Sequence, residues 1–497
     1  MRKSYVLLLL TAYLIASLSI IFPVYAEDSV PAPPGTEAES YILINAADNT
    51  VICEKNPDEK LYPASTTKIM TAILAIEAGL YDQTATVSRA AVERIGINGS
   101  NAGLKEGEIL QYKDLIRMTL ISSANDAANV LAEGVGGSIE NFVAIMNGKA
   151  KELGLRNTNF ANPSGLDVED GYPDHQTTAR DLAQIMRYAT SNYIFRQVIG
   201  ETEYSLPVTN LHPEIRGSRR STDLLLTDPR YQSGSFTVVG GKTGYTKAAW
   251  NVFVACARND DGVELILAIM KHPSRTGMFD DAYRLFEYGF ELAGTDQSLG
   301  AVDFYDLRYR ETSDVIHEFY EKGYIEGIDE GRFGCDEGVT GKEFLEVLGR
   351  INGNYAAASS GQPQSGISAV IDDGISDESR VGTGGMTYTR GDAINILGNY
   401  VVSRLNVMEM LGLMLRIKDM GSIPASSRKN VMKLCRAGII SVKDDGTIGY
   451  DDVITREEMV LLLERYISYR ENSMKTVLAI TENIPFIRKA VLSFQGP

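Results

Sequence analysis

The sequence predicts an α/β (α+β) chain, with helices and a sheet in its first part and a mainly helical repeat domain after it. An apolar run from Ile69 to Ile76 follows Pro63, which suits the first turn of a helix. Two β-rich runs, residues 236–239 and 251–255, indicate neighbouring strands. After residue 292 the pattern changes, which indicates a separable unit, and within it a stretch of sequence recurs at an offset of 115 residues. At 497 residues, the chain is long enough for two or three domains.

The first candidate site is Ser65-Thr66-Thr67-Lys68, directly ahead of the apolar helix. A helix N-terminus favours developing negative charge at Ser65, and Lys68 lies one turn further on the same face. A neutral Lys68 amine is a suitable base for the Ser65 hydroxyl, and burial together with a nearby cation such as Lys242 favours that neutral form. The alternative is an ordinary helix start with a surface lysine.

The second candidate is Ser123-Ala124-Asn125, between an apolar segment and a predicted helix that begins near Asp126. Here Ser123 is placed to relay a proton to a leaving amine, and Asn125 to hold a substrate amide. The alternative is a loop with a helix N-cap, for which these residue types are common.

The third candidate is Lys242-Thr243-Gly244, between the two β-rich runs. Gly244 on a strand edge lets a substrate backbone approach closely, while Lys242 and Thr243 are suited to a carboxylate. The alternative is an edge strand that carries a protective lysine.

The three strings spell S-x-x-K, S-x-N and K-T-G in order, which resembles penicillin-binding proteins and serine β-lactamases. Residues 38–293 resemble the D-alanyl-D-alanine carboxypeptidases, the low-molecular-weight penicillin-binding proteins. The segments Asn162–Leu166 and His175–Ala183 also match that family. The resemblance implies a β-lactamase/transpeptidase-like domain with an antiparallel sheet flanked by helices.

The resemblance also implies a role for each residue of the three motifs. Ser65 is the acylated nucleophile, Lys68 its base, and Ser123 and Asn125 form the second motif. Lys242, Thr243 and Gly244 form the third motif, whose lysine and threonine receive the substrate carboxylate. The backbone N–H groups of Ser65 and Tyr245 form the oxyanion hole. Metal and cofactor are not implied. Trp250, the one tryptophan in the chain, stands near a small Ala-Gly pair of the family pattern and changes the expected substrate rim.

The expected function is a secreted carboxypeptidase that removes the terminal D-alanine from peptidoglycan stem peptides through an acyl-enzyme and binds β-lactams. Three alternatives stay open: a β-lactamase, a DD-endopeptidase, and a non-catalytic cell-wall-binding protein. For a β-lactamase of the class A type, Glu169 is the nearest acid that could activate a deacylating water, and it lacks a matching partner.

Targeting and charge agree with an extracytoplasmic protein. Arg2 and Lys3 precede an apolar run that ends at Val24-Tyr25-Ala26, so residues 1–26 are expected to be a cleaved signal peptide, with an uncleaved anchor as the alternative. Cleavage takes the formal net charge from −17 to −19, because these residues contain two basic residues and no acids. Such a charge argues against nucleic acid as a partner.

The four cysteines show no metal-binding spacing, and their pairing does not follow from the sequence. Cys53 and Cys256 fall in strand-like runs and are expected to be buried thiols.

The C-terminal part resembles three S-layer homology repeats, expected at residues 303–352, 366–404 (degenerate) and 420–468, with a separate tail at 473–497. Each repeat is expected to form a helix, a Gly-rich loop and a second helix that begins at a threonine N-cap. The family implies binding to a secondary cell-wall polymer through an arginine, which corresponds here to Gly341, Arg390 and Arg456. A purely structural helical module is the alternative, and the tail is a weak candidate for a membrane-lying helix.

Overall fold

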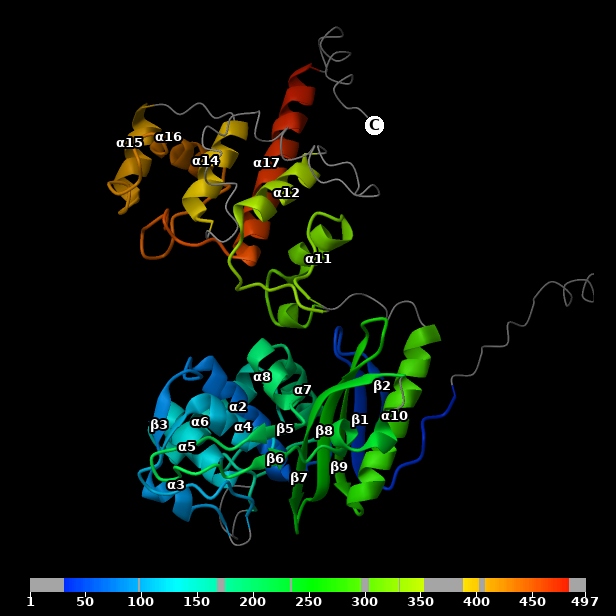
Figure 1. The fold of residues 1–497 in the computed structure, drawn as a ribbon. Helices are drawn as coiled ribbons and strands as arrows, with labels where there is room; N and C mark the ends of the chain where they lie inside the picture. Colours follow the sequence, from blue (N-terminus) through cyan, green and yellow to red (C-terminus); the bar gives the residue numbers. More distant parts are fainter. Residues whose placement is uncertain are drawn as a thin grey trace, which may run out of the picture.

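The computed structural model describes residues 31–96, 99–167, 175–232, 235–295, 304–329, 331–352, 388–401 and 407–481. The first part of the chain, up to residue 295, is a mixed α/β domain around a five-stranded antiparallel sheet in the order β2-β1-β9-β8-β7. The second part is mainly helical and has its own hydrophobic core (Figure 1). This confirms the predicted fold class. The expected signal peptide lies outside the described residues.

The central sheet is covered by helices on both faces. One face packs on α10 and α9, and the other on a group of helices that includes α2, α7 and α8. Two short two-stranded sheets, β3-β4 and β5-β6, lie apart from it. The strands are β1 (Ser40–Asn45), β2 (Val51–Lys55), β3 (Thr84–Thr86), β4 (Ile109–Gln111), β5 (Glu203–Ser205), β6 (Ser218–Arg220), β7 (Thr237–Thr246), β8 (Trp250–Arg258) and β9 (Glu264–His272). The helices are the 3-10 turns η1 (Ala64–Thr67) and η2 (Pro229–Tyr231) and the α-helices α2 (Lys68–Glu77), α3 (Arg89–Glu93), α4 (Tyr112–Leu120), α5 (Asn125–Gly136), α6 (Ile139–Glu152), α7 (Ala179–Thr190), α8 (Tyr193–Ile199), α9 (Leu224–Thr227) and α10 (Arg275–Thr295).

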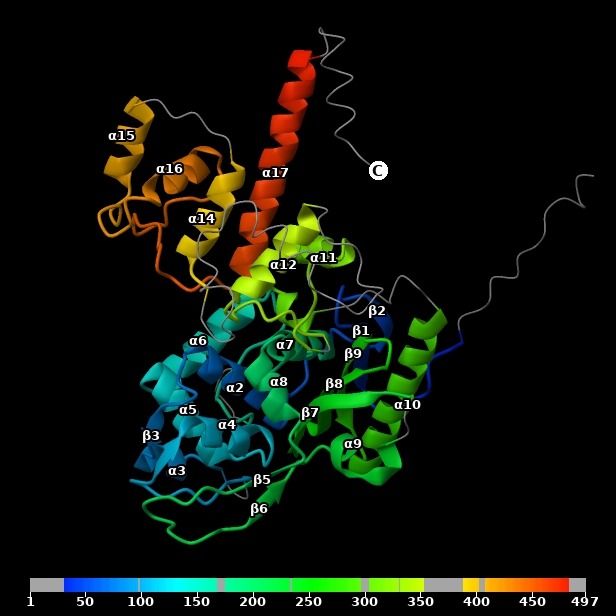
Figure 2. The same ribbon diagram turned by 45° about the horizontal axis from the view of Figure 1, so that its top comes forward.

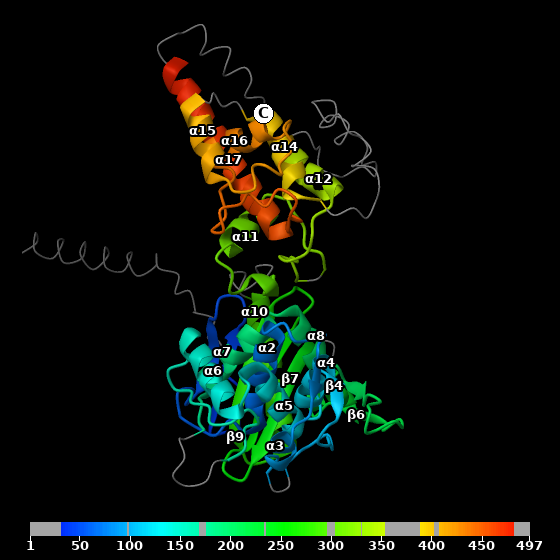
Figure 3. The same cartoon turned by 90° about the vertical axis from the view of Figure 1, so that its left-hand side faces the viewer.

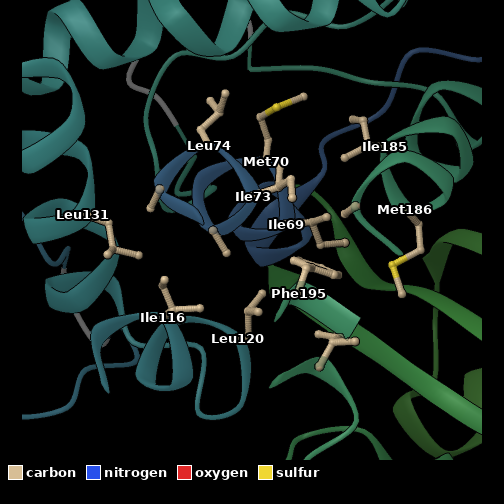
Figure 4. Packing of buried hydrophobic residues seen from close by; sticks show 14 of the residues in the cluster. Ile69, Met70, Ile73, Leu74, Ile116, Leu120, Leu131, Ile185, Met186 and Phe195 are labelled. Carbon is tan, nitrogen blue, oxygen red and sulfur yellow. The ribbon is translucent and has the colours of Figure 1, made fainter. Parts of the chain in front are cut away.

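Helix α2 is the centre of the larger core. Its residues from Lys68 to Ile76 are all buried, which is expected of a helix that is apolar on every side. Side chains from α4, α5, α7 and α8 surround it, among them Ile116, Leu131 and Phe195 (Figure 4). The helix therefore holds the Ser65 turn at its N-terminus in a fixed position.

In its described residues the second part contains η4 (Tyr305–Leu307) and six α-helices, of which α17 is the longest (Figure 2). The helices are α11 (Ser313–Glu321), α12 (Gly341–Ile351), α14 (Arg390–Tyr400), α15 (Val407–Arg416), α16 (Arg428–Arg436) and α17 (Arg456–Thr481). No helix in the described ranges is long and apolar enough to cross a membrane. Most of the C-terminal tail, like the first half of the expected second repeat, lies outside the described residues.

The repeat pattern appears directly in the backbone. Glycines that match at the offset of 115 have matching positive φ angles: 68° and 74° for Gly323 and Gly438, and 80° and 85° for Gly331 and Gly446. Such angles suit glycine because it lacks a Cβ atom. The predicted N-caps are present too, since the hydroxyls of Thr340, Thr389 and Thr455 each accept the N–H three residues on.

The residues ahead of these caps join the three units into a ring. The N–H of Val339 donates to the Ile454 carbonyl, that of Ile454 to the Tyr388 carbonyl, and that of Tyr388 to the Val339 carbonyl, over 3.0–3.2 Å. Each unit thus donates to one neighbour and accepts from the other. A single repeat leaves these groups unpaired, so the units stabilise one another.

Candidate active site

The three predicted motifs meet at one cavity, although they come from distant parts of the chain. Ser65 lies in η1, Ser123 directly before α5, and Lys242-Thr243-Gly244 in β7, which is an edge strand of the sheet. The cavity has a volume of about 980 Å³. Its lining includes Ser65, Ser123, Asn125, Thr243, Gly244 and Tyr245.

Two glycines allow the chain to close around Ser65. A Cβ on Gly244 would lie 2.9 Å from the Ser65 backbone nitrogen, and one on Gly165 would lie 1.8 Å from the Ala64 carbonyl oxygen. Real Cβ atoms do not approach other atoms so closely, so β7 and the loop that contains Gly165 pack directly on this turn only because both residues are glycine. Ser65 and Tyr245 both line the cavity beside this close contact.

Lys68 lies beside Ser65, as the spacing predicts. Its Nζ is 3.0 Å from the Ser65 Oγ and donates to the Ser164 carbonyl over 2.6 Å, and the side chain is fully buried. Burial lowers the pKa of the Lys68 amine well below its usual value, and the neighbouring Lys242 lowers it further. A lysine in this environment loses its proton readily and is suited to act as a base.

Ser123 lies between the first motif and the third. Its backbone adopts a φ of 60°, which is uncommon for a residue with a side chain, and its Oγ accepts a 3.0 Å hydrogen bond from the Lys242 Nζ. Asn125, two residues on, donates from Nδ2 to the Ile95 carbonyl and lines the cavity. The segment forms part of the cavity wall, and α5 begins at Asn125 with Ala124 as its N-cap residue.

Lys242 is fully buried behind the cavity wall, so it is not a protective lysine on a solvent-exposed strand edge. Its Nζ contacts the Ser123 Oγ and the Thr243 carbonyl. Burial lowers the pKa of the Lys242 amine to about 7, against an opposing effect of Asp223. Thr243 and Arg275 both line the cavity and both contact Thr222: the Thr243 hydroxyl donates to its Oγ1 over 2.7 Å, and the Arg275 guanidinium donates to its carbonyl over 3.1 Å.

Sequence reasoning missed Asp223. Its Oδ1 accepts the N–H of Leu225 at the start of α9, whereas its buried Oδ2 has no hydrogen-bond partner among the described residues. A Cβ on Gly241 would lie 2.6 Å from this Oδ2, so the carboxylate lies against the strand one residue before Lys242. Burial raises the pKa of Asp223 to about 7. The only sequence signal was a helix-capping aspartate, which many proteins carry.

The loop from Asn162 and the imidazole of His175 support the first motif from behind. The Asn162 Oδ1 accepts the N–H groups of three following residues and so shapes the loop whose carbonyl holds Lys68. His175 accepts the Ala161 N–H at Nδ1, which leaves Nε2 to donate to Thr67 over 2.8 Å. Burial lowers the pKa of His175 to about 3, so the ring is neutral.

Two other predictions concern residues outside the three motifs. Cys53 and Cys256 are buried free thiols, as expected. Trp250, half exposed, lies near Lys271, whose Nζ is 5.8 Å from the centre of the indole ring. Glu169, the nearest acid in the β-lactamase alternative, lies outside the described residues.

Comparison with known proteins agrees with this geometry. Residues 27–274 match the family profile of D-alanyl-D-alanine carboxypeptidases. The chain is 35% identical to the carboxypeptidase DacB2 of Mycobacterium tuberculosis over 267 residues, which cover 53% of this chain and 86% of that protein. This chain belongs to the D-alanyl-D-alanine carboxypeptidase family. It is also 40% identical over 266 residues to DacF of Bacillus subtilis, with coverage of 50% of this chain and 63% of that protein.

A second match lies in the helical part. Residues 416–460 match the profile of the S-layer homology domain. These residues include α16, the Gly-rich loop after it and the start of α17. They correspond to the third of the expected repeats. A carboxypeptidase-family domain is therefore joined to an S-layer homology domain in one chain, and this combination implies an extracytoplasmic location at the cell wall.

Proposed function

We propose that this protein is a secreted serine D-Ala-D-Ala carboxypeptidase that trims peptidoglycan stem peptides through an acyl-enzyme on Ser65. The observation that carries the proposal is the 3.0 Å approach of the buried Lys68 amine to the Ser65 hydroxyl at the edge of a large cavity. Membership of the carboxypeptidase family supports the substrate class. Residues 1–26 are the proposed signal peptide for export.

In the proposed reaction, neutral Lys68 takes the proton of Ser65 while Oγ attacks the carbonyl carbon between the two terminal D-alanines. The N–H groups of Ser65 and Tyr245 stabilise the oxyanion. Ser123, held by Lys242, relays this proton from Lys68 to the leaving amine, so D-alanine departs and Lys68 is neutral again. Water then cleaves the ester: its hydroxyl joins the acyl carbon, and its proton goes to the Ser65 Oγ. A β-lactam acylates the same serine.

We propose that the substrate carboxylate is bound by Thr243 and Arg275, with Lys242 behind them as a further source of positive charge. Arg275 and Thr243 line the cavity, where the Thr243 hydroxyl donates to the Thr222 Oγ1 over 2.7 Å, whereas Lys242 is fully buried. Arginine suits carboxylates because its planar guanidinium presents paired donors. Asn125 is placed to hold the peptide backbone of the substrate.

Intact-mass measurement after penicillin treatment tests the acyl-enzyme. We expect one covalent adduct, mapped to Ser65 by peptide analysis, and its loss in Ser65→Ala. A matched control is Ser122→Ala, whose hydroxyl is next in sequence to Ser123 and bonds instead to the Met118 carbonyl. An adduct on Ser123, or none on folded protein, contradicts the proposal and favours a non-catalytic wall-binding protein.

Turnover separates the remaining alternatives. A carboxypeptidase releases D-alanine from a diacyl-D-Ala-D-Ala peptide and hydrolyses penicillin slowly. A β-lactamase shows the opposite preference, and a DD-endopeptidase cuts cross-linked muropeptides faster than linear ones. The same purified protein on these three substrates decides among them.

We further propose that the helical part binds a secondary cell-wall polymer. The match to the S-layer homology domain supports this, as does a cavity of about 290 Å³ whose lining includes Glu343, Arg350 and Arg456. The full chain should sediment with wall fragments that keep the polymer and stay in solution with fragments stripped of it. Equal sedimentation with both kinds of fragment contradicts binding to that polymer.

A further inference from the structure

The helical repeats rest on one end of the carboxypeptidase domain, near α7, α8 and the start of β9 (Figure 3). The contact begins at η4, where the chain enters the second part. Phe304 and Leu307 are buried in the core of the repeats. Tyr305 and Arg308, between and after them, contact the carboxypeptidase domain instead. One turn of helix is therefore anchored in both domains.

A buried ion triad lies at the centre of this contact. Glu264, the first residue of β9, pairs with Arg196 of α8 and with Arg308 of the repeats. The side chain of Glu264 is 2% exposed and that of Arg308 is 0% exposed. The two guanidinium groups lower the pKa of Glu264 to about 2 despite its burial. Its carboxylate is thus ionised, and its stabilisation depends on charges from both domains.

Aromatic and cationic side chains surround the triad. The Arg196 guanidinium lies 4.0 Å from the centre of the Tyr305 ring, and that of Arg332 lies 3.8 Å from the centre of the Tyr193 ring. Tyr309 packs edge-on against Tyr188, with ring centres 5.0 Å apart. Each domain supplies both aromatic rings and guanidinium groups to these contacts.

We propose that this surface, made of Arg187, Tyr188, Tyr193, Arg196 and Glu264, is a docking site for the repeats, which fix the direction in which the active-site cavity faces. Helix α10 runs from the active-site cavity toward the end of the carboxypeptidase domain that contacts the repeats. Its first residue, Arg275, lines the cavity, and the other end of α10 lies toward the helical repeats (Figure 1). A helix of 21 residues is about 30 Å long. Docked repeats therefore hold the Arg275 side of the cavity about one length of α10 from the contact between the domains.

The docking proposal goes beyond the proposed function and does not require it, because its tests use no catalytic readout. The full chain should unfold in calorimetry with coupled domains, and its small-angle scattering should match one rigid particle. Arg308→Ala leaves Glu264 buried with one partner. We expect it to lower the unfolding midpoint of the carboxypeptidase domain by roughly 6 °C or more, to separate the two transitions and to raise the radius of gyration.

Lys322→Ala is the matched control, because it removes an exposed ion pair within the repeats. It should leave both measurements unchanged. If Arg308→Ala does not fold, Tyr309→Ala at the rim of the contact should loosen the particle in the same direction to a smaller extent. A wild-type chain that scatters as two independent bodies, or an Arg308→Ala chain identical to wild type in both measurements, overturns the proposal.

Discussion

The two parts of the molecule bury positive charge in opposite ways. In the carboxypeptidase domain, Lys68 and Lys242 are fully buried, and each has a pKa below its usual value. In the repeats, Arg456 pairs with Glu343 and Arg390 with Glu458, across the boundaries between units. A base must give up its charge easily, whereas a structural cation must keep it. The choice of lysine at the candidate active site and of arginine in the structural ion pairs, which include Arg196 with Glu264, follows this difference.

The arginine pairs also explain why one repeat lacks its arginine. Arg456 of the third unit pairs with Glu343 of the first, and Arg390 of the second pairs with Glu458 of the third. The third such contact would run from the first unit to the second. There the first unit has Gly341, and a Cβ added to it would lie 3.2 Å from the aromatic side chain of Tyr388 in the second unit. This tyrosine therefore takes the place of the third ion pair. Two ion pairs and one tyrosine contact thus join the three units.

Replacing the base should have the largest effect. Lys68→Arg keeps a positive charge, but a guanidinium does not release its proton and cannot activate Ser65. We expect the rate of acylation by penicillin to fall by roughly 10³-fold. Stopped-flow or gel labelling with a fluorescent penicillin measures this rate, and circular dichroism checks the fold. Acylation at the wild-type rate would remove Lys68 from the mechanism.

Substitution of Arg275 and of Lys242 should affect the preference for a free terminal carboxylate differently. Arg275→Ala should lower kcat/KM by roughly 10- to 100-fold for a peptide with a free terminal carboxylate, and far less for its amide analogue, because a charged hydrogen bond is lost. Lys242→Ala should lower both, since the Lys242 Nζ also holds Ser123. Equal losses for the two substrates in Arg275→Ala would mean that this guanidinium does not contact the carboxylate.

Asp223 should set the pH range in which Lys242 is charged. Lys242 and Asp223 each have a pKa of about 7, and Asp223, once ionised, holds up the pKa of Lys242. The positive charge of Lys242 is therefore present below about pH 7 and is lost as the pH rises. Asp223→Asn should lower the pKa of Lys242 and move the alkaline fall of kcat/KM to lower pH. If that pKa falls by about one, activity on the alkaline side should fall about tenfold. Asp228→Asn, at a similar helix cap on the surface, is the control and should leave the profile unchanged.

The sequence predicted contacts that depend on local geometry. Three residues of helix bring Lys68 to Ser65, and a threonine with an acid three residues on predicts the caps of α12, α14 and α17. The matched positive φ angles of the repeat glycines follow from the same kind of local rule. The ordered motifs also identified the strand that lines the cavity.

Contacts between distant segments were not predictable in this way. Burial of Lys242, the position of Arg275 at the cavity and the unpartnered oxygen of Asp223 depend on how β7, α9 and α10 pack. The change of pattern after residue 292 suggested a separable unit, and nothing in the sequence indicated that Arg308 pairs with Glu264. Hydrophobic spacing shows which face of a helix is buried, but not which partner covers it.

The smallest expected effect is that of Arg456, and it tests whether this arginine only stabilises the repeats or also binds the wall polymer. Arg456→Ala leaves the partly exposed Glu343 without its partner, and we expect the free energy of unfolding of the repeats to fall by about 2 kcal/mol. The double variant Arg456→Ala/Glu343→Gln should recover part of this loss, because no unpaired charge remains. If Arg456 also binds the wall polymer, the double variant stays deficient in wall sedimentation although its stability has recovered. If sedimentation recovers together with stability, the arginine acts only through the fold, and the polymer binds elsewhere.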